Sequence, residues 1–362
     1  MSDYNIVTIE SLSQWKGLSQ SWNVLLTKSS ANTIFLTWEW LFSWAETYLN
    51  KTRKLFILTV FKDDELVAIA PWYIQRLKSG AFTAKQIQFL GAPEGGSDYL
   101  DVIIKKGQEQ KVTLRLCDFL LKEAASQWDC CMLEDLSSNS LFLLHFLKKI
   151  EEEGKYAEIR PGSFCPTVVL PKKGEDLFTR YSSHRRLQYR RHFKILKSKG
   201  ELNHSSQDGG NIEKALDDFC NFYETKNEKN DKSVRSFIVR YAAQSRAQDS
   251  MQVDLFTLNG ILIGGLLNLK YGDTLSQYLM AVDKQYIPQI SLGNILVGMC
   301  LGRAIDNGFT VYDFLKGPEP YKFHWAESGR SAVRLYFYQK RVAPLFLAFG
   351  KLMKYAAKTV LR

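Results

Sequence analysis

A polar and aromatic cluster follows the last short strand-like run in the second half of this 362-residue chain. Asp313 stands near the end of that run, and the sequence KGPEPYK, Lys316 to Lys322, comes directly after it. Open α/β sheets place their sites at such strand ends. We therefore take Asp313, Glu319, Tyr321 and Lys322 as the candidate catalytic residues. A carboxylate there can accept a proton from an attacking amine, which is mostly protonated at neutral pH.

Two members of this cluster have more than one interpretation. Tyr321 can donate a proton to a leaving group or a hydrogen bond to substrate. Lys322 can pair with a phosphate of a ligand or simply with Glu319. The cluster as a whole is either a reactive site or a salt-bridged surface loop.

A loop-to-helix junction precedes the cluster and reads Ser291-Leu292-Gly293-Asn294. The first turn of a helix carries unpaired N–H groups and a partial positive charge, which suit a pyrophosphate. Gly293 would let the backbone approach a ligand closely, and Ser291 can cap the helix or donate to the ligand. The junction is a candidate binding site for an anionic, phosphate-bearing ligand.

Several common catalytic motifs are missing from the sequence. There is no G-x-x-x-x-G-K-[ST], no H-E-x-x-H and no G-x-S-x-G. The six cysteines form no C-x-x-C and have no histidine at metal-ligand spacing. These absences argue against hydrolase and metalloenzyme functions, and we expect no metal.

The elements that must position these residues form an α/β pattern. A hairpin with its turn at Asn259-Gly260 leads into strand-like runs at 261–270 and 274–283, then a helix at 292–307 and a strand at 310–315. A similar order occurs earlier, with a hairpin turn at Asp63-Asp64 and a strand that starts at Trp128-Asp129, matching Tyr312-Asp313. The chain length also favours two domains. The pattern predicts a duplicated α/β domain whose second copy is the active half.

The stretch 177–200 holds eight Lys and Arg residues and no acidic residue. As a helix it would place Arg186, Arg190 and Lys194 on one face and Tyr189 and Phe193 on another. Eight uncompensated like charges favour binding of an anion, although a solvated helix face remains the alternative.

The net charge of +10 asks for an anionic partner such as a nucleic acid, an anionic lipid or a phosphate-rich cofactor. The tail, 344–362, has apolar side chains near one face and lysines on another, so it either lies on an anionic membrane surface or packs on the protein body. The start of the chain shows no secretory signal, and no apolar run approaches the length of a membrane span. We expect a cytoplasmic protein, with a peripheral position at the inner membrane face as an alternative.

The second half resembles a known family in the order of its motifs. Tyr278 to Asp283 ends a strand, Ser291-Leu292-Gly293 forms the loop, and Gly308 precedes Tyr312-Asp313-Phe314. The series closes with Gly317, Glu319 and Tyr321-Lys322. This order is similar to that of GNAT-fold acyltransferases of the CelD type, which are related to the FemAB-like transferases. The segments Phe89-Leu90-Gly91 and Asp98 to Asp101, and the basic helix 185–199, also resemble that family.

The resemblance implies mixed α/β sheets in two tandem GNAT-like acyl-CoA N-acyltransferase domains. We expect an N-terminal domain at 1–165, a C-terminal domain with the active site at 166–342, and a basic amphipathic helix at 343–362. The donor would be an acyl-CoA whose pantetheine arm slots between two splayed strands, with the pyrophosphate on the following helix. The expected donor-binding residues are Tyr278, Met280, Val282, Ser291, Leu292, Gly293 and Asn294. The sequence departs from the family at Leu292, where many relatives have proline.

The implied reaction moves an acyl group by direct attack onto an amine or hydroxyl, often of a bacterial cell-envelope sugar or polysaccharide. The residues expected to bind the acceptor substrate are Asp98, Tyr99, Asp101, Arg186 and Arg190. Two alternatives stay open. One is a FemAB-type transferase that takes its group from aminoacyl-tRNA, and the other is a non-catalytic, membrane-associated protein with the same fold.

Overall fold

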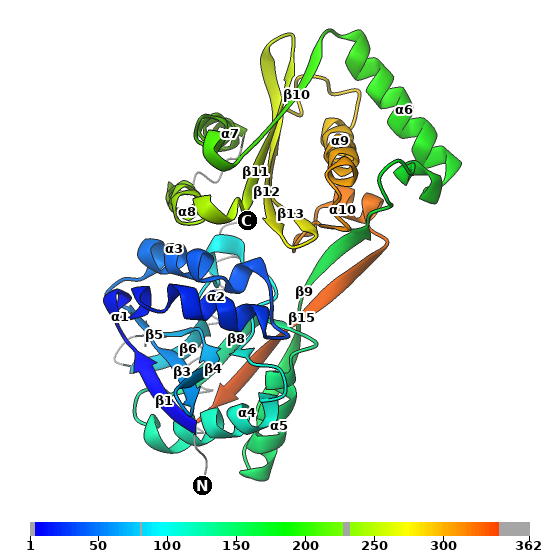
Figure 1. The fold of residues 1–362 in the computed structure, drawn as a ribbon. Coiled ribbons are helices and arrows are strands. Elements are labelled where there is room, and N and C mark those ends of the chain that lie inside the picture. The colour runs from blue at the N-terminus through cyan, green and yellow to red at the C-terminus, as the bar shows by residue number, and fades with distance from the viewer. Residues whose placement is uncertain (1–3, 80–81, 227–231, 340–362) are drawn as a thin grey trace. The chain divides into compact units, whose positions relative to one another are not determined.

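The computed structural model describes residues 4–79, 82–226 and 232–339, which fall into two compact units (Figure 1). Unit 2 comprises Phe164–Arg330, and unit 1 comprises the described residues up to Ser163 and from Ser331 onward. The chain passes between the units twice, within β9 (Ala157–Val169) and within β15 (Ser328–Tyr338). The expected domain boundaries were 165/166 and 342/343. The contacts instead return the end of β15 to unit 1, and the expected helix at 343–362 lies outside the described residues.

Unit 1 contains two sheets and a helical layer. One sheet has the order β1-β3-β4-β7, and the other runs β8-β6-β5-β2 with the end of β15 paired antiparallel to β8. Its strands are β1 (Tyr4–Ile9), β2 (Arg53–Leu55), β3 (Ile57–Lys62), β4 (Glu65–Ala70), β5 (Trp72–Ser79), β6 (Phe82–Phe89), β7 (Ile103–Ile104) and β8 (Cys130–Ser137). Its helices are α1 (Leu12–Lys16), α2 (Ser19–Thr27), α3 (Trp38–Tyr48), α4 (Glu109–Asp118) and α5 (Leu141–Glu152). Fully buried tryptophans at 15, 22, 40 and 44 join the first helices into one aromatic core.

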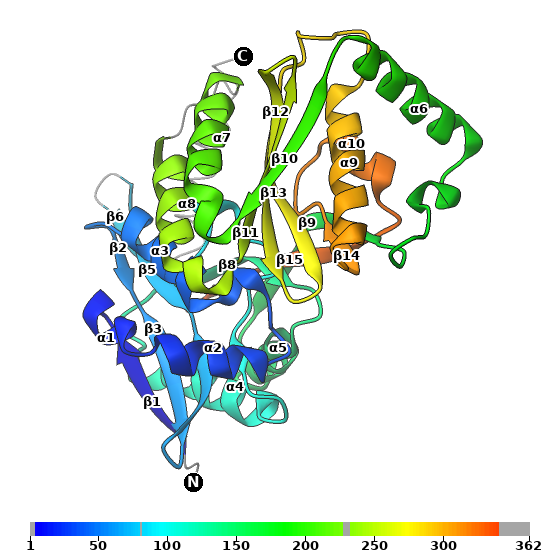
Figure 2. The ribbon, with the colours of Figure 1, turned by 45° about the horizontal axis from the view of Figure 1, so that its top comes forward.

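Unit 2 is one sheet with helices on both faces. The sheet order is β10-β11-β12-β13-β14-β9, and only the β13–β14 pair is parallel. Its other strands are β10 (Leu202–Asp208), β11 (Met251–Leu258), β12 (Ile261–Tyr271), β13 (Thr274–Val282) and β14 (Val311–Asp313). Its helices are α6 (Ser183–Ser198), α7 (Ile212–Lys226), α8 (Lys232–Gln244), α9 (Leu292–Asp306) and α10 (Pro320–Trp325). Within this unit α7 and α8 cover one face of the sheet and α9 covers the other (Figure 2).

Most elements of unit 2 that position the candidate site were predicted, with boundaries shifted by a few residues. The hairpin turn at Asn259-Gly260 is confirmed, and both residues have the positive φ of a tight turn, 51° and 78°. Leu202–Asp208 forms β10, which pairs with β11. The strand β9 extends to Val169, and its residues Thr167–Val169 pair with β14. The mixed α/β class is confirmed.

Candidate active site

The strands β13 and β14 separate at the predicted site. They pair in parallel only from Thr274–Val311 to Ser276–Asp313, where β14 ends while β13 continues to Val282. At the separation β13 also carries one extra residue, Tyr278, because its pairing with β12 steps from Asn268–Gln277 to Leu267–Leu279. Such a bulge bends the strand and raises its local twist, and bulges are common beside active sites. The segment 277–282 therefore runs beyond the end of β14.

A chain of three polar side chains marks the point of separation. The Gln277 amide nitrogen donates to the Tyr321 hydroxyl oxygen over 2.7 Å, and the Tyr312 hydroxyl donates to the Gln277 amide oxygen over 3.0 Å. Gln277 is buried, and Tyr312 is fully buried. Because the Tyr321 oxygen accepts from Gln277, its own proton is left to donate to another group.

Burial controls the protonation of these tyrosines. Desolvation raises the pKa of Tyr321 far above the ordinary value of a tyrosine, and the nearby Glu319 carboxylate raises it further. Burial raises the pKa of Tyr312 in the same direction. Both phenols are therefore neutral at physiological pH. Tyr321 is equipped to donate a hydrogen bond to a developing negative charge, and it is not equipped to act as a base.

The other three candidate catalytic residues shape the loop between β14 and α10. The buried Asp313 carboxylate accepts from the Leu315 N–H over 2.8 Å, which holds a tight turn. The buried Lys322 ammonium pairs with Glu319 at 3.0 Å and donates to the Leu315 and Lys316 carbonyl oxygens over 3.3 and 2.8 Å. These three partners match the three donors of an ammonium group. Lys322 thus ties the loop together, as in the salt-bridged alternative.

Gly317 makes this loop possible. Its φ is +148°, and a Cβ there would lie 2.5 Å from the Lys322 ammonium nitrogen and closer still to the Glu319 carboxylate. A side chain at this position would therefore push apart the ion pair that closes the loop. Glu319 remains half exposed, with 49% of its side chain accessible, so its carboxylate can still meet an incoming acceptor.

The expected donor-binding residues gather where α9 begins. A Cβ built on Gly293 would be in ordinary contact with Met280 and Val282 of β13, at 3.5 and 3.7 Å. Ser291 is the N-cap residue, but its side chain does not bond to the helix, and its own N–H donates to the Nδ1 atom of His192. The Asn294 side-chain oxygen is buried and has no hydrogen-bond partner in the described part of the chain. The start of α9 thus combines three features beside β13. They are the N–H groups of a first helical turn, the Ser291 hydroxyl that does not cap the helix, and the buried Asn294 amide oxygen.

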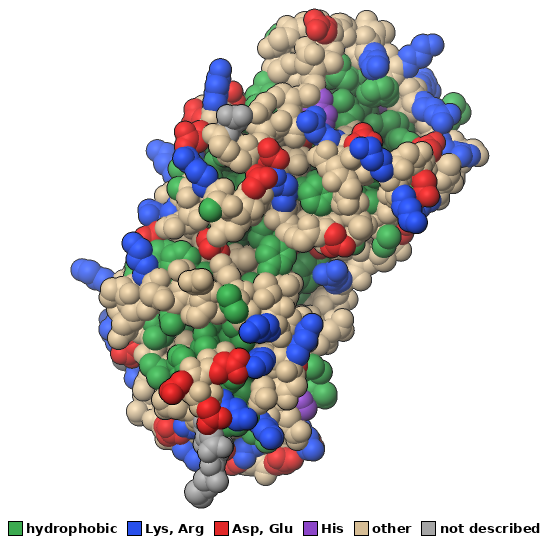
Figure 3. Space-filling view, in the orientation of Figure 1, with side chains coloured by type: hydrophobic (Ala, Val, Ile, Leu, Met, Phe, Trp, Pro, Cys, Tyr) green, Lys and Arg blue, Asp and Glu red, His purple; other side chains and the backbone are tan. Residues whose placement is uncertain are grey.

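Helix α6 lies against α9. The Tyr189 hydroxyl donates to the Ile295 carbonyl oxygen over 3.3 Å, and the ring fits against Gly298, where a Cβ would come within 2.4 Å of it. Tyr189 and Phe193 pack on the core of unit 2, as the predicted apolar face of this helix requires. Lys and Arg side chains gather over α6 on the outer surface (Figure 3).

The two arginines expected to bind substrate lie on this helix. Arg186 donates to Ser183 over 3.3 Å, whereas Arg190 is exposed and makes no ion pair with the described part of the chain. Asp98, Tyr99 and Asp101, the other expected substrate residues, belong to unit 1 and are all buried. The structure therefore does not gather these five residues within one unit, and their role in substrate binding remains a prediction.

Asp101 has a clear structural surrounding. Its carboxylate oxygen Oδ1 accepts from the Val102 N–H and from the Ser140 hydroxyl, each over 2.7 Å. Desolvation raises the pKa of Asp101 to about 7, and the two hydrogen bonds only partly oppose this shift. Asp101 therefore connects the strand β7 region to the N-terminus of α5 within unit 1.

A buried polar group lies in the core of unit 2. The Asp254 carboxylate contacts the His204 Nε2 atom and accepts from the Gln252 and Asn268 side-chain amides, each over 2.8 Å. The Cys300 thiol also hydrogen-bonds to it. His204, Asp254 and Cys300 could offer one ligand atom each to a metal, and these three atoms lie within 4.8 Å of one another. The hydrogen bonds from Gln252, Asn268 and Cys300 satisfy the Asp254 carboxylate. The cluster is thus explained as a buried hydrogen-bond network, and the proposed reaction needs no metal there.

Sequence reasoning missed Gln277 and Tyr312 as site residues. Gln277 lies in β13 directly opposite Asn268 of β12, and Asn268 interrupts an apolar run. Polar side chains in strands that are buried on both faces need hydrogen-bond partners. The polar Gln277 in such a strand was therefore the sequence signal that could have identified it as a site residue. The bulge at Tyr278 had no such signal, because it depends on the register between two strands.

The fold of unit 2 is that of a GNAT-like acyltransferase domain. Residues 183–323 match the family described as "Acetyltransferase (GNAT) domain", which spans α6 to α10. The match covers less than half of the chain, and it agrees with the GNAT-like fold predicted for the C-terminal part and with the predicted acyltransferase class. The match favours an enzyme over the non-catalytic alternative. No curated protein matches the chain.

Solved structures with the same fold cover nearly the whole chain. FemX aligns with a TM-score of 0.62 at 11% identity, covering 94% of this chain and 99% of that one. L-PGS from Bacillus licheniformis aligns with a TM-score of 0.54 at 10% identity, covering 91% and 94%. The C-terminal domain of a putative lysylphosphatidylglycerol synthetase from Agrobacterium fabrum gives 0.53 at 10% identity, covering 94% and 95%. At such low identity these likenesses establish the fold. Among the described residues, no helix is long and apolar enough to cross a membrane.

Proposed function

We propose that unit 2 moves an acyl group from an acyl-CoA to an amine or hydroxyl of a small acceptor, such as a sugar or polysaccharide. The observation that carries this proposal is the divergence of β13 from β14 beside the start of α9. That divergence leaves 277–282 next to a helix N-terminus, with Tyr321 at the point of separation.

The donor would lie along β13. Its pantetheine arm is an extended, amide-containing chain. Such a chain can bind along the edge of β13 where β13 continues beyond the end of β14. Its pyrophosphate would lie at the first turn of α9, where backbone N–H groups and the helix dipole favour an anion. Gly293 and the side chains of Met280 and Val282 would contact the arm, and Ser291 and Asn294 would face the phosphates.

The reaction would be a direct displacement. The acceptor nitrogen or oxygen forms a bond to the thioester carbonyl carbon, the carbon–sulfur bond breaks, and the thiol leaves as a thiolate. The half-exposed Glu319 carboxylate receives the proton that the acceptor loses. Tyr321 keeps its proton, because its raised pKa lies well above the ordinary value of a thiol, and stabilises the developing negative charge by hydrogen bonding.

A substitution at Gly293 tests the donor site. The Gly293→Ala variant should fold normally, because the new Cβ meets nothing closer than 3.5 Å. It would nevertheless occupy the space next to the donor, so we expect the affinity for acetyl-CoA, measured by calorimetry, to fall tenfold or more. Gly302→Ala on the same helix is the control, since a Cβ there meets nothing within 4 Å. If no acyl-CoA from a panel of chain lengths binds to the unaltered protein, the proposal fails.

Aminoacyl-tRNA is the second candidate donor, and the charge of α6 favours it. Arg190, Arg191 and Lys194 are all exposed on a helix without an acidic residue. Binding of tRNA through such contacts should weaken steeply as salt rises. Filter retention of tRNA by the unaltered protein and by the Arg190→Gln/Arg191→Gln/Lys194→Gln variant would decide. Equal retention by both proteins, or a flat response to salt, would exclude tRNA.

Two wider expectations are part of the proposal. The reaction would take place in the cytoplasm, where acyl-CoA is available, and its products would serve a bacterial cell envelope. An anionic membrane surface is a further expected partner, through residues 343–362. Flotation with liposomes, with and without 351–362, tests that association.

A further inference from the structure

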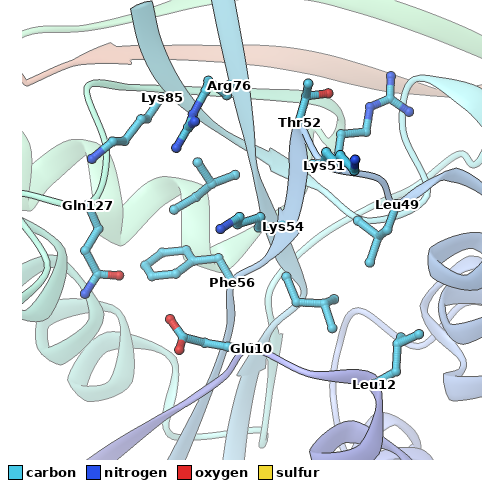
Figure 4. A pocket seen from close by; sticks show the side chains of 13 residues that line it. Glu10, Leu12, Leu49, Lys51, Thr52, Lys54, Phe56, Arg76, Lys85 and Gln127 are labelled. Carbon is cyan, nitrogen blue, oxygen red and sulfur yellow. The ribbon is translucent and has the colours of Figure 1, made fainter.

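Unit 1 contains a groove that the proposed reaction does not use. The groove has a volume of about 710 Å³ and lies at β2, the edge strand of its sheet (Figure 4). Five of its lining residues are basic: Lys51, Arg53, Lys54, Arg76 and Lys85. Among the described residues that line the groove, Glu10 alone is acidic. This volume falls within the ordinary range of small-molecule sites, about 300–1,000 Å³.

Four of the five cations have no acidic partner in the described part of the chain. Arg53 forms a bidentate pair with Glu94, at 2.7 and 2.9 Å, and the Lys85 ammonium donates to the Ser126 carbonyl oxygen. Lys51, Lys54 and Arg76 are exposed and form no ion pair with the described part of the chain. Arg76 and Lys85 stand side by side, and Lys54 extends towards them (Figure 4). The groove therefore carries a surplus of positive charge.

The strand register makes this surplus unfavourable for the protein alone. Arg76 of β5 is the direct cross-strand partner of Lys85 of β6, and Lys54 of β2 is the partner of Ile74. Like charges directly opposite each other on an antiparallel pair destabilise it. A bound anion would reverse that effect, and arginine beside lysine is the usual composition of a phosphate site.

The base of the groove is apolar. Phe56 and Leu55 are buried, and Leu12, Leu49 and Ile74 are partly buried around them. Thr52 and Gln127 add hydrogen-bonding groups at the rim. A site with cations at its rim and aliphatic and aromatic side chains below suits a ligand with an anionic head and an apolar body.

We infer that this groove binds an amphiphilic phosphate ester. The phosphate contacts Lys54, Arg76 and Lys85, and the apolar body lies over Phe56 and Ile74. Such an ester can be a soluble molecule or the headgroup of a membrane lipid, and both share the same chemistry. The site lies wholly within unit 1, so the inference does not rest on the function proposed for unit 2.

Calorimetry on the full chain with matched probes tests this inference. Octyl phosphate should bind at least tenfold more tightly than inorganic phosphate, which lacks the tail, and octyl glucoside, which lacks the charge. The Lys54→Gln/Arg76→Gln variant should lose at least tenfold in affinity for octyl phosphate. Lys106→Gln/Lys111→Gln is the control, with the same change in charge at exposed positions of unit 1 outside the groove. The Gly293→Ala variant should bind octyl phosphate as the unaltered protein does.

Two further readouts keep the test decisive. The Arg76→Gln variant should melt at a higher temperature than the unaltered protein without ligand, because the like-charge pair with Lys85 is relieved. If the unaltered protein floats with phosphatidylglycerol vesicles and the Lys54→Gln/Arg76→Gln variant does not, the ligand is a lipid headgroup. If the unaltered protein binds monomeric octyl phosphate but not the vesicles, the ligand is a soluble ester. Equal affinity of the double variant and the unaltered protein for octyl phosphate, or equal affinity for octyl glucoside, would overturn the inference.

Discussion

At the scale of single residues, the hydrogen-bond direction at Tyr321 decides what the candidate site can do. An amide nitrogen can only donate, so the Gln277 contact makes the phenol oxygen an acceptor and leaves its proton for a ligand. Lys322 has the opposite status, since the loop carbonyls and Glu319 use its donors. The sequence placed both residues in one cluster, but only their partners separate a reactive group from a structural one.

The Tyr321→Phe variant is the most direct test of this distinction. It removes one hydrogen-bond donor and keeps the ring, so we expect kcat to fall by about 10²-fold, as for the loss of one donor to a developing negative charge. The KM for acyl-CoA should change little. Steady-state kinetics would check both values, and Tyr156→Phe, at a tyrosine 79% exposed in unit 1, is the control. A variant with full kcat would remove Tyr321 from the mechanism.

A pH-dependent stability test addresses Asp101. Its pKa is raised to about 7 in the folded protein, so its neutral form stabilises unit 1. This contribution is fully present below the unfolded value, near 3.9, and is lost as the pH rises through about 7, by on the order of 1.4 kcal/mol for each pH unit between the two values. The Asp101→Asn variant keeps an oxygen for Val102 and Ser140 but cannot ionise. Urea unfolding should show it equal to the unaltered protein near pH 4 and more stable at pH 8.

The matched comparison is Asp118, whose pKa is lowered by its hydrogen bond to Lys122. The Asp118→Asn variant should therefore be the less stable protein at pH 8, the opposite sign to Asp101→Asn. An Asp101→Asn variant that is less stable than the unaltered protein at pH 8 would show that the carboxylate is needed in its charged form, as a role in substrate binding requires.

At the scale of elements, the loop from β14 to α10 depends on one glycine. The Gly317→Ala variant places a Cβ against the Glu319–Lys322 pair at a φ of +148°. We expect a loss of about 1–3 kcal/mol in the free energy of unfolding, together with a loss of activity, because Tyr321 follows directly on this loop. Denaturant unfolding and the kinetic assay would measure the two effects.

Gly302→Ala, within α9, provides the element-scale control. It has open space around it, and alanine favours a helix over glycine by about 0.5–1 kcal/mol. It should therefore stabilise the protein slightly and leave activity unchanged. Similar effects of the two substitutions would contradict the role assigned to the loop.

The elements also show what sequence reasoning could reach. Turns such as Asn259-Gly260 have their own chemical signal, and the apolar runs on either side fix β11 and β12. The start of α9 at Leu292 could also be predicted, because the Ser291-Leu292-Gly293-Asn294 junction marks a helix start in the sequence. The strand β10 could not be predicted, because polar residues such as His204 are typical of a loop. The structure shows that His204 is paired with the buried Asp254 of the neighbouring strand. The bulge at Tyr278 arises from pairing between strands, which a single strand does not encode.

At the scale of the whole molecule, the net charge of +10 is divided among separate features. In unit 2, part of the positive charge lies on the exposed cations of α6. In unit 1, another part lies on the basic residues of the groove at β2. The sequence drew attention to α6 and to the tail, where the cations lie close together along the chain. It could not show the groove, because Lys54, Arg76 and Lys85 come from three strands and meet only through their register.

Hydrogen exchange can locate the two proposed ligands, because each has its site within one unit. Octyl phosphate should slow exchange in β2, β5 and β6, and acetyl-CoA should slow it in β13 and the first turn of α9. At a hundred times its Kd a ligand adds about 2.7 kcal/mol to the stability of the state that binds it, which is a large change for a local opening. Mass spectrometry of peptides from the full chain resolves these segments. Protection of β13 by octyl phosphate would indicate one phosphate site in unit 2, because that ligand would then compete with acetyl-CoA, and the groove at β2 would lose its assigned role.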